Sequence, residues 1–81
     1  MSRRTKVVER KLGREHALGE AFQGLNEIHI DPRQPPKEYL DTLVHESLHL
    51  AFPDLNEEAV SDGATMVARI LWAQNFRKCS L

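Results

Sequence analysis

Prolines bracket the central segment of this chain and limit where a helix can lie. Pro32, Pro35 and Pro36 prevent a helix from starting before about residue 36, because proline lacks an amide donor and suits only the first helical turn. Pro53 breaks the helical pattern at the other end. The sequence therefore predicts a helix that begins near Pro36 and ends near Ala51.

This predicted helix has an apolar face and a polar face. Its apolar residues recur at helical spacing and are Leu40, Leu43, Val44, Leu48 and Ala51. The residues on roughly the opposite side are Glu38, Thr42, His45 and His49. One face is thus suited to a core and the other to chemistry.

A second helix is predicted directly after Pro53. Asp54 can cap its first turn while Glu57 reaches back to it, which is the pattern of a capping box. The apolar residues that follow at helical spacing are Ala59, Val60, Ala64, Val67, Ile70 and Leu71. Because the connection is short, we expect the two helices to lie antiparallel as a tight pair.

The segments before the helices indicate short strands. Residues 5–12 predict a weak strand, whereas residues 16–22 fit helical spacing and strand alternation alike. Residues 27–31 alternate, with Ile28 and Ile30 on one side, and they follow a turn-like stretch, which favours a hairpin. We therefore expect an α+β fold in which a small antiparallel β-hairpin or meander packs on two antiparallel helices.

Composition narrows the class of protein. With 11 basic and 12 acidic residues, the net charge of −1 provides no overall basic field, so we expect no nucleic-acid partner. Cys79 is the only cysteine, which excludes a disulfide framework within one chain and favours a reducing compartment. No apolar run approaches the length of a membrane span. We expect a cytoplasmic protein that makes no membrane contact.

His45-Glu46-Ser47-Leu48-His49 writes the pattern H-E-x-x-H into the first predicted helix. Residues four apart lie one above the other on a helix, so the two imidazoles can bind the same metal ion. The carboxylate of Glu46 would then lie beside the metal's open position, where it can accept a proton from water. This stretch predicts the site of a zinc hydrolase.

Two histidines seldom hold a catalytic zinc without a third protein ligand. Glu58 is the favoured candidate, because it lies in the first turns of the second helix; Glu57 is the alternative, although capping explains it better. Asp62 follows Glu58 by one helical turn. We expect Asp62 to accept a hydrogen bond from the second ring N–H of a ligating histidine.

The first motif, followed by Asn56-Glu57-Glu58-Ala59-Val60-Ser61-Asp62, resembles the metal core of the gluzincin metallopeptidases. Thermolysin-like members of that group carry H-E-x-x-H on one helix and E-x-x-x-D on the next. The resemblance implies the zinc ligands His45, His49 and Glu58, the general base Glu46, and Asp62 as a hydrogen-bonding partner of a histidine. Residues 18–32 also look like small phage-type proteins with the same helix pair. On this resemblance, residues 1–81 form one minimal zincin-like domain.

The sequence departs from the thermolysin-like pattern in its ligand spacing, and no motif identifies a residue that would stabilise the reaction intermediate. The interval between His49 and Glu58 is much shorter than in thermolysin-like peptidases, and a group that stabilises the tetrahedral intermediate would have to come from His29, Tyr39 or Arg69. The exposed edge of the strand at residues 27–31 could hold an extended peptide by strand addition.

Three functions are compatible with these patterns. The favoured one is a zinc metallopeptidase that hydrolyses a peptide or protein substrate, with Glu46 as general base. The alternative is a non-catalytic, zinc-stabilised binding or scaffold module. A third is a metal-free helical interaction module that uses Leu71, Trp72 and Phe76 as a partner surface.

Overall fold

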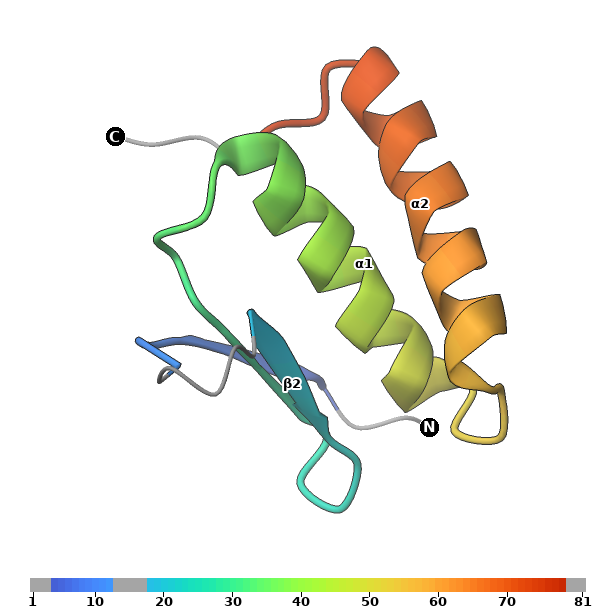
Figure 1. Ribbon diagram of the computed structural model, residues 1–81. Helices are drawn as coiled ribbons and strands as arrows, with labels where there is room; N and C mark the ends of the chain where they lie inside the picture. Colours follow the sequence, from blue (N-terminus) through green and yellow to red (C-terminus); the bar gives the residue numbers. More distant parts are fainter. Residues whose placement is uncertain (1–3, 13–17, 79–81) are drawn as a thin grey trace.

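The computed structural model describes residues 4–12 and 18–78 and has an α+β fold (Figure 1). Its elements are β1 (Lys6–Glu9), β2 (Gly19–Phe22), β3 (Glu27–Ile30), α1 (Pro36–Ala51) and α2 (Glu57–Ala73). Gly19–Phe22 is a strand, which resolves the part of the ambiguous segment that can be described; residues 16 and 17, like Cys79, lie outside the described residues.

The sheet is mixed, with the strand order β1-β3-β2. β2 and β3 form the predicted antiparallel hairpin, with Gly19 opposite Ile30 and Phe22 opposite Glu27. β1 instead runs parallel to β3, so the sheet is the predicted hairpin with one added parallel strand and is not an antiparallel meander. Parallel neighbours need a long connection, and β1 and β3 are joined through the whole of β2 and its flanking loops. As a result, β3 is central, and no other described strand pairs with the outer edge of β2.

α1 lies between the sheet and α2, and it is the element on which the other layers pack (Figure 1). Ile28 and Ile30 of β3 are fully buried, as their alternation predicted. On α2 the buried residues are Val60, Ala64 and Ala68, which follow each other at four-residue steps. These side chains are small or β-branched, so the two helices can approach closely.

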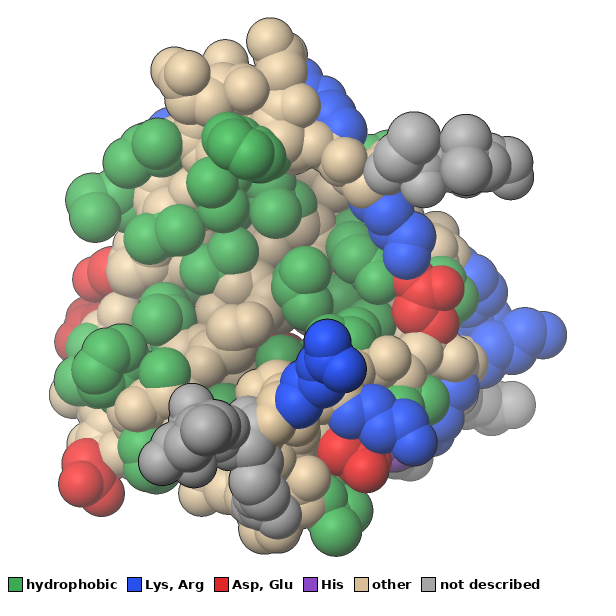
Figure 2. Space-filling model, turned by 180° about the vertical axis from the view of Figure 1, so that it is seen from behind, with side chains coloured by type: hydrophobic (Ala, Val, Ile, Leu, Met, Phe, Trp, Pro, Cys, Tyr) green, Lys and Arg blue, Asp and Glu red, His purple; other side chains and the backbone are tan. Residues whose placement is uncertain are grey.

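The outer side of α2 remains apolar and open. The predicted core residues Val67 and Ile70 are 36% and 55% exposed, because α2 is covered by α1 on one side alone within the described chain. Phe76 is also exposed, whereas Leu71 and Trp72 are half-buried. Figure 2 shows hydrophobic side chains gathered on the face seen from behind. Neither described helix has the length and apolar character that would allow it to cross a membrane.

The ends of the helices explain where the site forms. α1 begins at Pro36 and ends at Ala51, as predicted from the prolines. α2 begins at Glu57, and its N-cap is Asn56, whose side-chain oxygen accepts from the Ala59 amide at 2.7 Å. The predicted capping box at Asp54 is therefore wrong. The chain uses the residues around Asp54 for the turn between the helices, so Glu57 has no capping role.

A buried carboxylate fixes the path from β3 to α1. Asp31 is 4% exposed and accepts from the Leu12 amide and from the side chain of Arg33, whose Nη2 lies 2.6 Å away. The hydrogen bonds of Arg33 hold the pKa of Asp31 well below its usual range. Gln34 next donates to the carbonyl of Asp31 and accepts from the Thr42 hydroxyl at 2.8 Å. These bonds set the position of α1 relative to β3.

Candidate metal centre

His45, His49 and Glu57 come together where α1 turns back into α2. One carboxylate oxygen of Glu57 lies 2.8 Å from Nε2 of His45 and 3.1 Å from Nε2 of His49. The three potential ligand atoms all lie within 4.8 Å of one another. The two histidines lie one helical turn apart on α1, and Glu57 is the first residue of α2, so the short turn between the helices assembles the cluster.

This donor set can hold a divalent metal ion. Two imidazole nitrogens and one carboxylate oxygen are a ligand combination found in catalytic zinc sites, which keep a further position for water. The side chains of His45 and His49 are 23% and 27% exposed, and that of Glu57 is 63% exposed. The cluster is therefore anchored on the protein side and open to solvent on the other.

The charge on Glu57 suits this role. Partial burial acts to raise the pKa of its carboxyl, but hydrogen bonds to His45 and His49 outweigh that effect, and the pKa lies below its ordinary value. The carboxylate is thus ionised where a cation would be bound.

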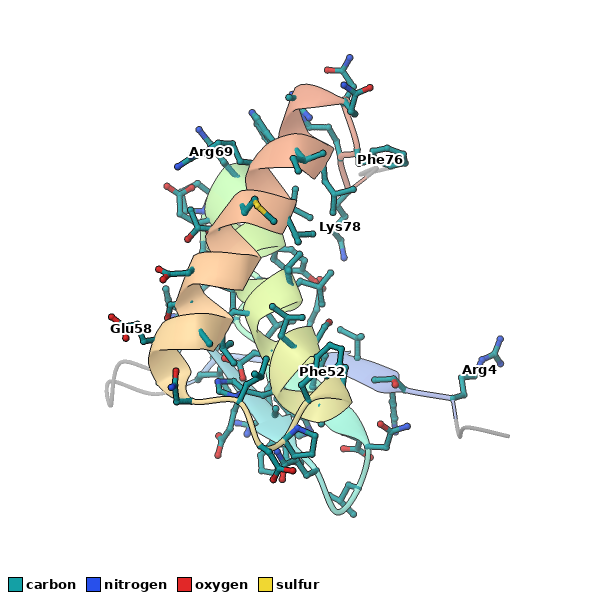
Figure 3. All side chains as sticks on the ribbon, turned by 90° about the vertical axis from the view of Figure 1, so that its right-hand side faces the viewer. Arg4, Phe52, Glu58, Arg69, Phe76 and Lys78 are labelled. Atoms are coloured by element: carbon teal, nitrogen blue, oxygen red, sulfur yellow. The ribbon has the colours of Figure 1, made fainter. Side chains whose placement is uncertain are left out.

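The structure brings Glu57, and not Glu58, to the two histidines, which corrects the favoured third ligand. Successive helical residues are rotated by about 100°, so neighbouring glutamates cannot face the same point. Glu58 is exposed and projects outward from α2 (Figure 3). The sequence argument placed the ligand one residue too late because it used Glu57 as the capping partner of Asp54.

Asp62 was expected to support a histidine, and this expectation depended on Glu58. Asp62 is exposed, and among the described residues no hydrogen bond joins it to His45 or His49. Ser61 lies one helical turn after Glu57, so Ser61 and not Asp62 shares the face of α2 that carries the third candidate ligand.

Glu46 lies beside the cluster on α1, with its side chain turned toward β2. It lines a shallow cleft of about 210 Å³ together with His45, Gly19, Thr42, Leu18 and Asp41. Burial raises the pKa of its carboxyl, and the two histidines oppose this shift. A carboxyl group thus lines the cleft next to a potential ligand, His45.

Of the three residues considered for stabilising a reaction intermediate, His29 is held on the outer face of the sheet. Its neighbours Ile28 and Ile30 are buried beneath α1, so the alternation of the strand directs His29 away from the cluster. Its Nδ1 accepts from Arg10 Nε at 2.7 Å, and its Nε2 lies 3.0 Å from the Glu27 carboxylate. These contacts give His29 a role within the sheet.

Tyr39 and Arg69 also lie away from the histidines. The Tyr39 hydroxyl donates to the carboxylate of Glu9 on β1, at the opposite end of α1 from the turn. Arg69 is exposed in the later half of α2, several turns from Glu58 (Figure 3). Neither residue is placed to act at the cluster in this structure.

Two contacts around the site had no signal in the sequence. The side chain of Gln23, in the hairpin turn, donates to the backbone carbonyl of His49 at 3.0 Å and ties the hairpin to the end of α1. Gly19 packs against Thr42 and Glu46. Both contacts join residues from distant parts of the chain, so no local pattern could have indicated them.

No family model matches this sequence, and neither the curated proteins nor the solved structures gave a match.

Proposed function

We propose that this chain is a minimal zinc-dependent peptidase in which His45, His49 and Glu57 bind the metal and Glu46 acts as general base. The observation that carries the proposal is the convergence of the three ligand atoms, with Glu57 Oε1 at 2.8 and 3.1 Å from the imidazole nitrogens. A surface cluster without a function would not require a carboxylate in the adjoining cleft. The pattern of His45, Glu46 and His49 on α1 supplies one there.

The metal and the chain would contribute different parts of the chemistry. Bound zinc supplies Lewis acidity, which makes water more acidic and polarises a carbonyl group. Glu46 accepts the proton of the attacking water and returns it to the leaving amine. His45, His49 and Glu57 would hold the ion, and His45 also lines the cleft that contains Glu46.

The free edge of β2 is the best-placed surface for an extended substrate. The edge of residues 27–31, expected from the sequence, is unavailable because β3 is paired on both sides. The Leu18 carbonyl accepts from the Asp31 amide, so the alternation of an antiparallel pair directs the N–H and C=O groups of Gly19 and Ala21 to the free edge. A peptide that pairs there would pass beside the cleft that Glu46 lines.

A non-catalytic, zinc-stabilised module is the second candidate. It is favoured by one observation: within the described residues α2 packs against α1 alone, so a metal bound by His45, His49 and Glu57 would pin the two helices together. The absence of His29, Tyr39 and Arg69 from the cluster also fits this function, because none of them then needs to act on a substrate.

The comparison of wild type with Glu46→Gln separates the two candidates. Elemental analysis should find about one zinc per chain in both proteins, since Glu46 is not a ligand. A peptide-library assay, inhibited by a chelator and restored by zinc, should detect cleavage by the wild type and almost none by the variant.

Each other result has a definite meaning. Equal cleavage by both proteins would indicate a contaminating protease, and no cleavage by zinc-loaded wild type would favour the scaffold module. Zinc loss in Glu46→Gln would show that Glu46 is itself a metal ligand and that the ligand assignment is wrong. Absence of metal from protein purified out of zinc-replete medium would favour the metal-free interaction module.

A further inference from the structure

Gly19 of β2 lies close to the side of α1 that carries Glu46. A Cβ atom placed on Gly19 would lie 2.6 Å from Thr42 Cγ2, 3.1 Å from Glu46 Cγ and 3.5 Å from Glu46 Oε2. Non-bonded carbon atoms prefer separations of about 3.5–4.0 Å. Gly19 does not have a positive φ, so its backbone could accept another residue. What the position requires is empty space next to α1.

Thr42 cannot easily move to provide that space. Its hydroxyl donates to Gln34 Oε1 at 2.8 Å, and the amide of the same Gln34 donates to the carbonyl of Asp31 at 2.8 Å. The Thr42 methyl group is therefore held by a chain of hydrogen bonds that ends on the backbone carbonyl of Asp31, the residue after β3. A Cβ added at position 19 would be pushed away from Thr42 and would crowd Glu46, whose side chain makes no such bond to any described residue.

We propose that Gly19 is a positioning residue for Glu46. The missing side chain leaves a space facing Thr42 and Glu46, which lie one helical turn apart on α1, and this space lets the Glu46 carboxylate lie in the cleft beside His45. The inference rests on the proposed role of Glu46 as general base. A shift of about 1 Å in a catalytic group can cost on the order of a hundredfold in rate, so small packing changes here should have large effects.

Two other glycines provide matched controls. A Cβ on Gly24 would meet nothing within 4 Å, and one on Gly63 would lie 3.4 Å from Leu48 Cδ1, an ordinary packing distance. Neither has a positive φ. Gly24→Ala and Gly63→Ala therefore make the same chemical change as Gly19→Ala without crowding Glu46.

The kinetic test uses zinc-loaded protein and the best-cleaved peptide from the library. Gly19→Ala should lower kcat on the order of a hundredfold. KM and the dissociation constant for zinc should stay close to those of the wild type, because the ligands and the β2 edge remain. Gly24→Ala and Gly63→Ala should retain wild-type kcat.

A second substitution should relieve the crowding. Thr42→Ser removes the methyl group at 2.6 Å but keeps the hydroxyl that Gln34 requires. Gly19→Ala/Thr42→Ser should recover about tenfold of the lost rate, since only the 3.1 Å contact with Glu46 then remains. A merely structural role for Gly19 would not give this rescue at unchanged zinc affinity.

A readout that needs no catalysis is the NMR spectrum of the folded protein. The wild type should show an NOE between the Hα atoms of Gly19 and the side chain of Glu46. Gly19→Ala should shift the side-chain resonances of Glu46 while those of His45 and His49 stay in place. Wild-type kcat in Gly19→Ala, or unshifted Glu46 resonances, overturns the proposal.

The two proposals fail in different ways. If the wild type cleaves no peptide, the peptidase function fails, and the NMR comparison still decides whether Gly19 positions Glu46. If Gly19→Ala alone does not fold, the double variant replaces it. It should then show about a tenfold loss of kcat and shifted Glu46 resonances, and wild-type behaviour there overturns the inference.

Discussion

Glu57 and Glu58 are neighbours with the same side chain, but only Glu57 is directed at His45 and His49. Glu57→Gln should weaken zinc binding by more than about ten- to hundredfold, which is the loss typical when a residue that hydrogen-bonds to a ligand is changed. The larger loss is expected because the substitution removes a negatively charged metal ligand. Glu58→Gln is the matched control and should leave the zinc dissociation constant nearly unchanged. Competition with a chromophoric chelator measures both values. A larger loss of zinc affinity in Glu58→Gln than in Glu57→Gln would show that Glu58, the residue favoured from the sequence, is the third ligand.

The sequence could identify the two histidines and not this glutamate, for a physical reason. His45 and His49 lie within one uninterrupted helix, so their relative position follows from helical geometry alone. Which glutamate of α2 faces them depends on the residue at which α2 starts. Asp54 and Asn56 are both good caps, and the choice between them rotates every later side chain relative to α1.

Asp31 is the residue whose charge should most affect acid stability. Hydrogen bonds from the side chain and then the backbone of Arg33 depress its pKa, so the unfolded chain binds the proton more readily than the folded one. The stabilising contribution is therefore complete above about pH 4 and is lost as the pH falls below that value.

Asp31→Asn should lower the free energy of unfolding at neutral pH and flatten its decline between about pH 4 and pH 2. Urea unfolding at several pH values measures both effects. The same substitution at the exposed Asp54 serves as control and should leave the pH dependence as in the wild type. An unchanged acid profile in Asp31→Asn would show that the folded state gains nothing from this carboxylate.

At the scale of elements, local signals located α1 and the β-hairpin, whereas the pairing of β1 had no signal in the sequence. α1 matched its prediction because prolines fix both of its ends, and the hairpin of β2 and β3 matched because its turn is local. The parallel pairing of β1 with β3 joins residues about twenty positions apart, and no periodicity encodes such a partner. The strand-edge prediction failed for the same reason.

Asn56 is the residue that defines the start of α2. Asn56→Ala removes the acceptor for the Ala59 amide and should cost about 0.5–2 kcal/mol in the free energy of unfolding. Asp54→Ala should change it by less than about 0.5 kcal/mol, as is usual for an exposed residue. Denaturant titration of both variants in the presence of a chelator isolates the capping effect. The reverse order of the two effects would restore Asp54 as the cap.

At the scale of the whole molecule, a bound metal should act as a cross-link between the two helices. A ligand that binds only the folded state raises the free energy of unfolding by about 2.7 kcal/mol when its free concentration is a hundred times its dissociation constant. For a chain of this size, that increase raises Tm by roughly 10–20 °C. Calorimetry with added zinc and then with a chelator measures the shift. His45→Ala should fold without this gain, and an equal zinc-dependent shift in that variant would place the metal elsewhere.

The mixed topology of the sheet also has a consequence for how the chain opens. Within the described residues β3 is the only element that packs against β1, and the further hydrogen bonds of β1 join the Lys6 amide to the Asn26 carbonyl and Glu9 to Tyr39 and Lys78. Native-state hydrogen exchange should therefore show the β1 amides exchanging before those of β3 and α1, through a local opening. Equal protection of all three would show that β1 opens only with the whole fold. During folding, β1 would dock last although it is synthesised first, onto a hairpin and a helix pair that already hold His45, His49 and Glu57 together.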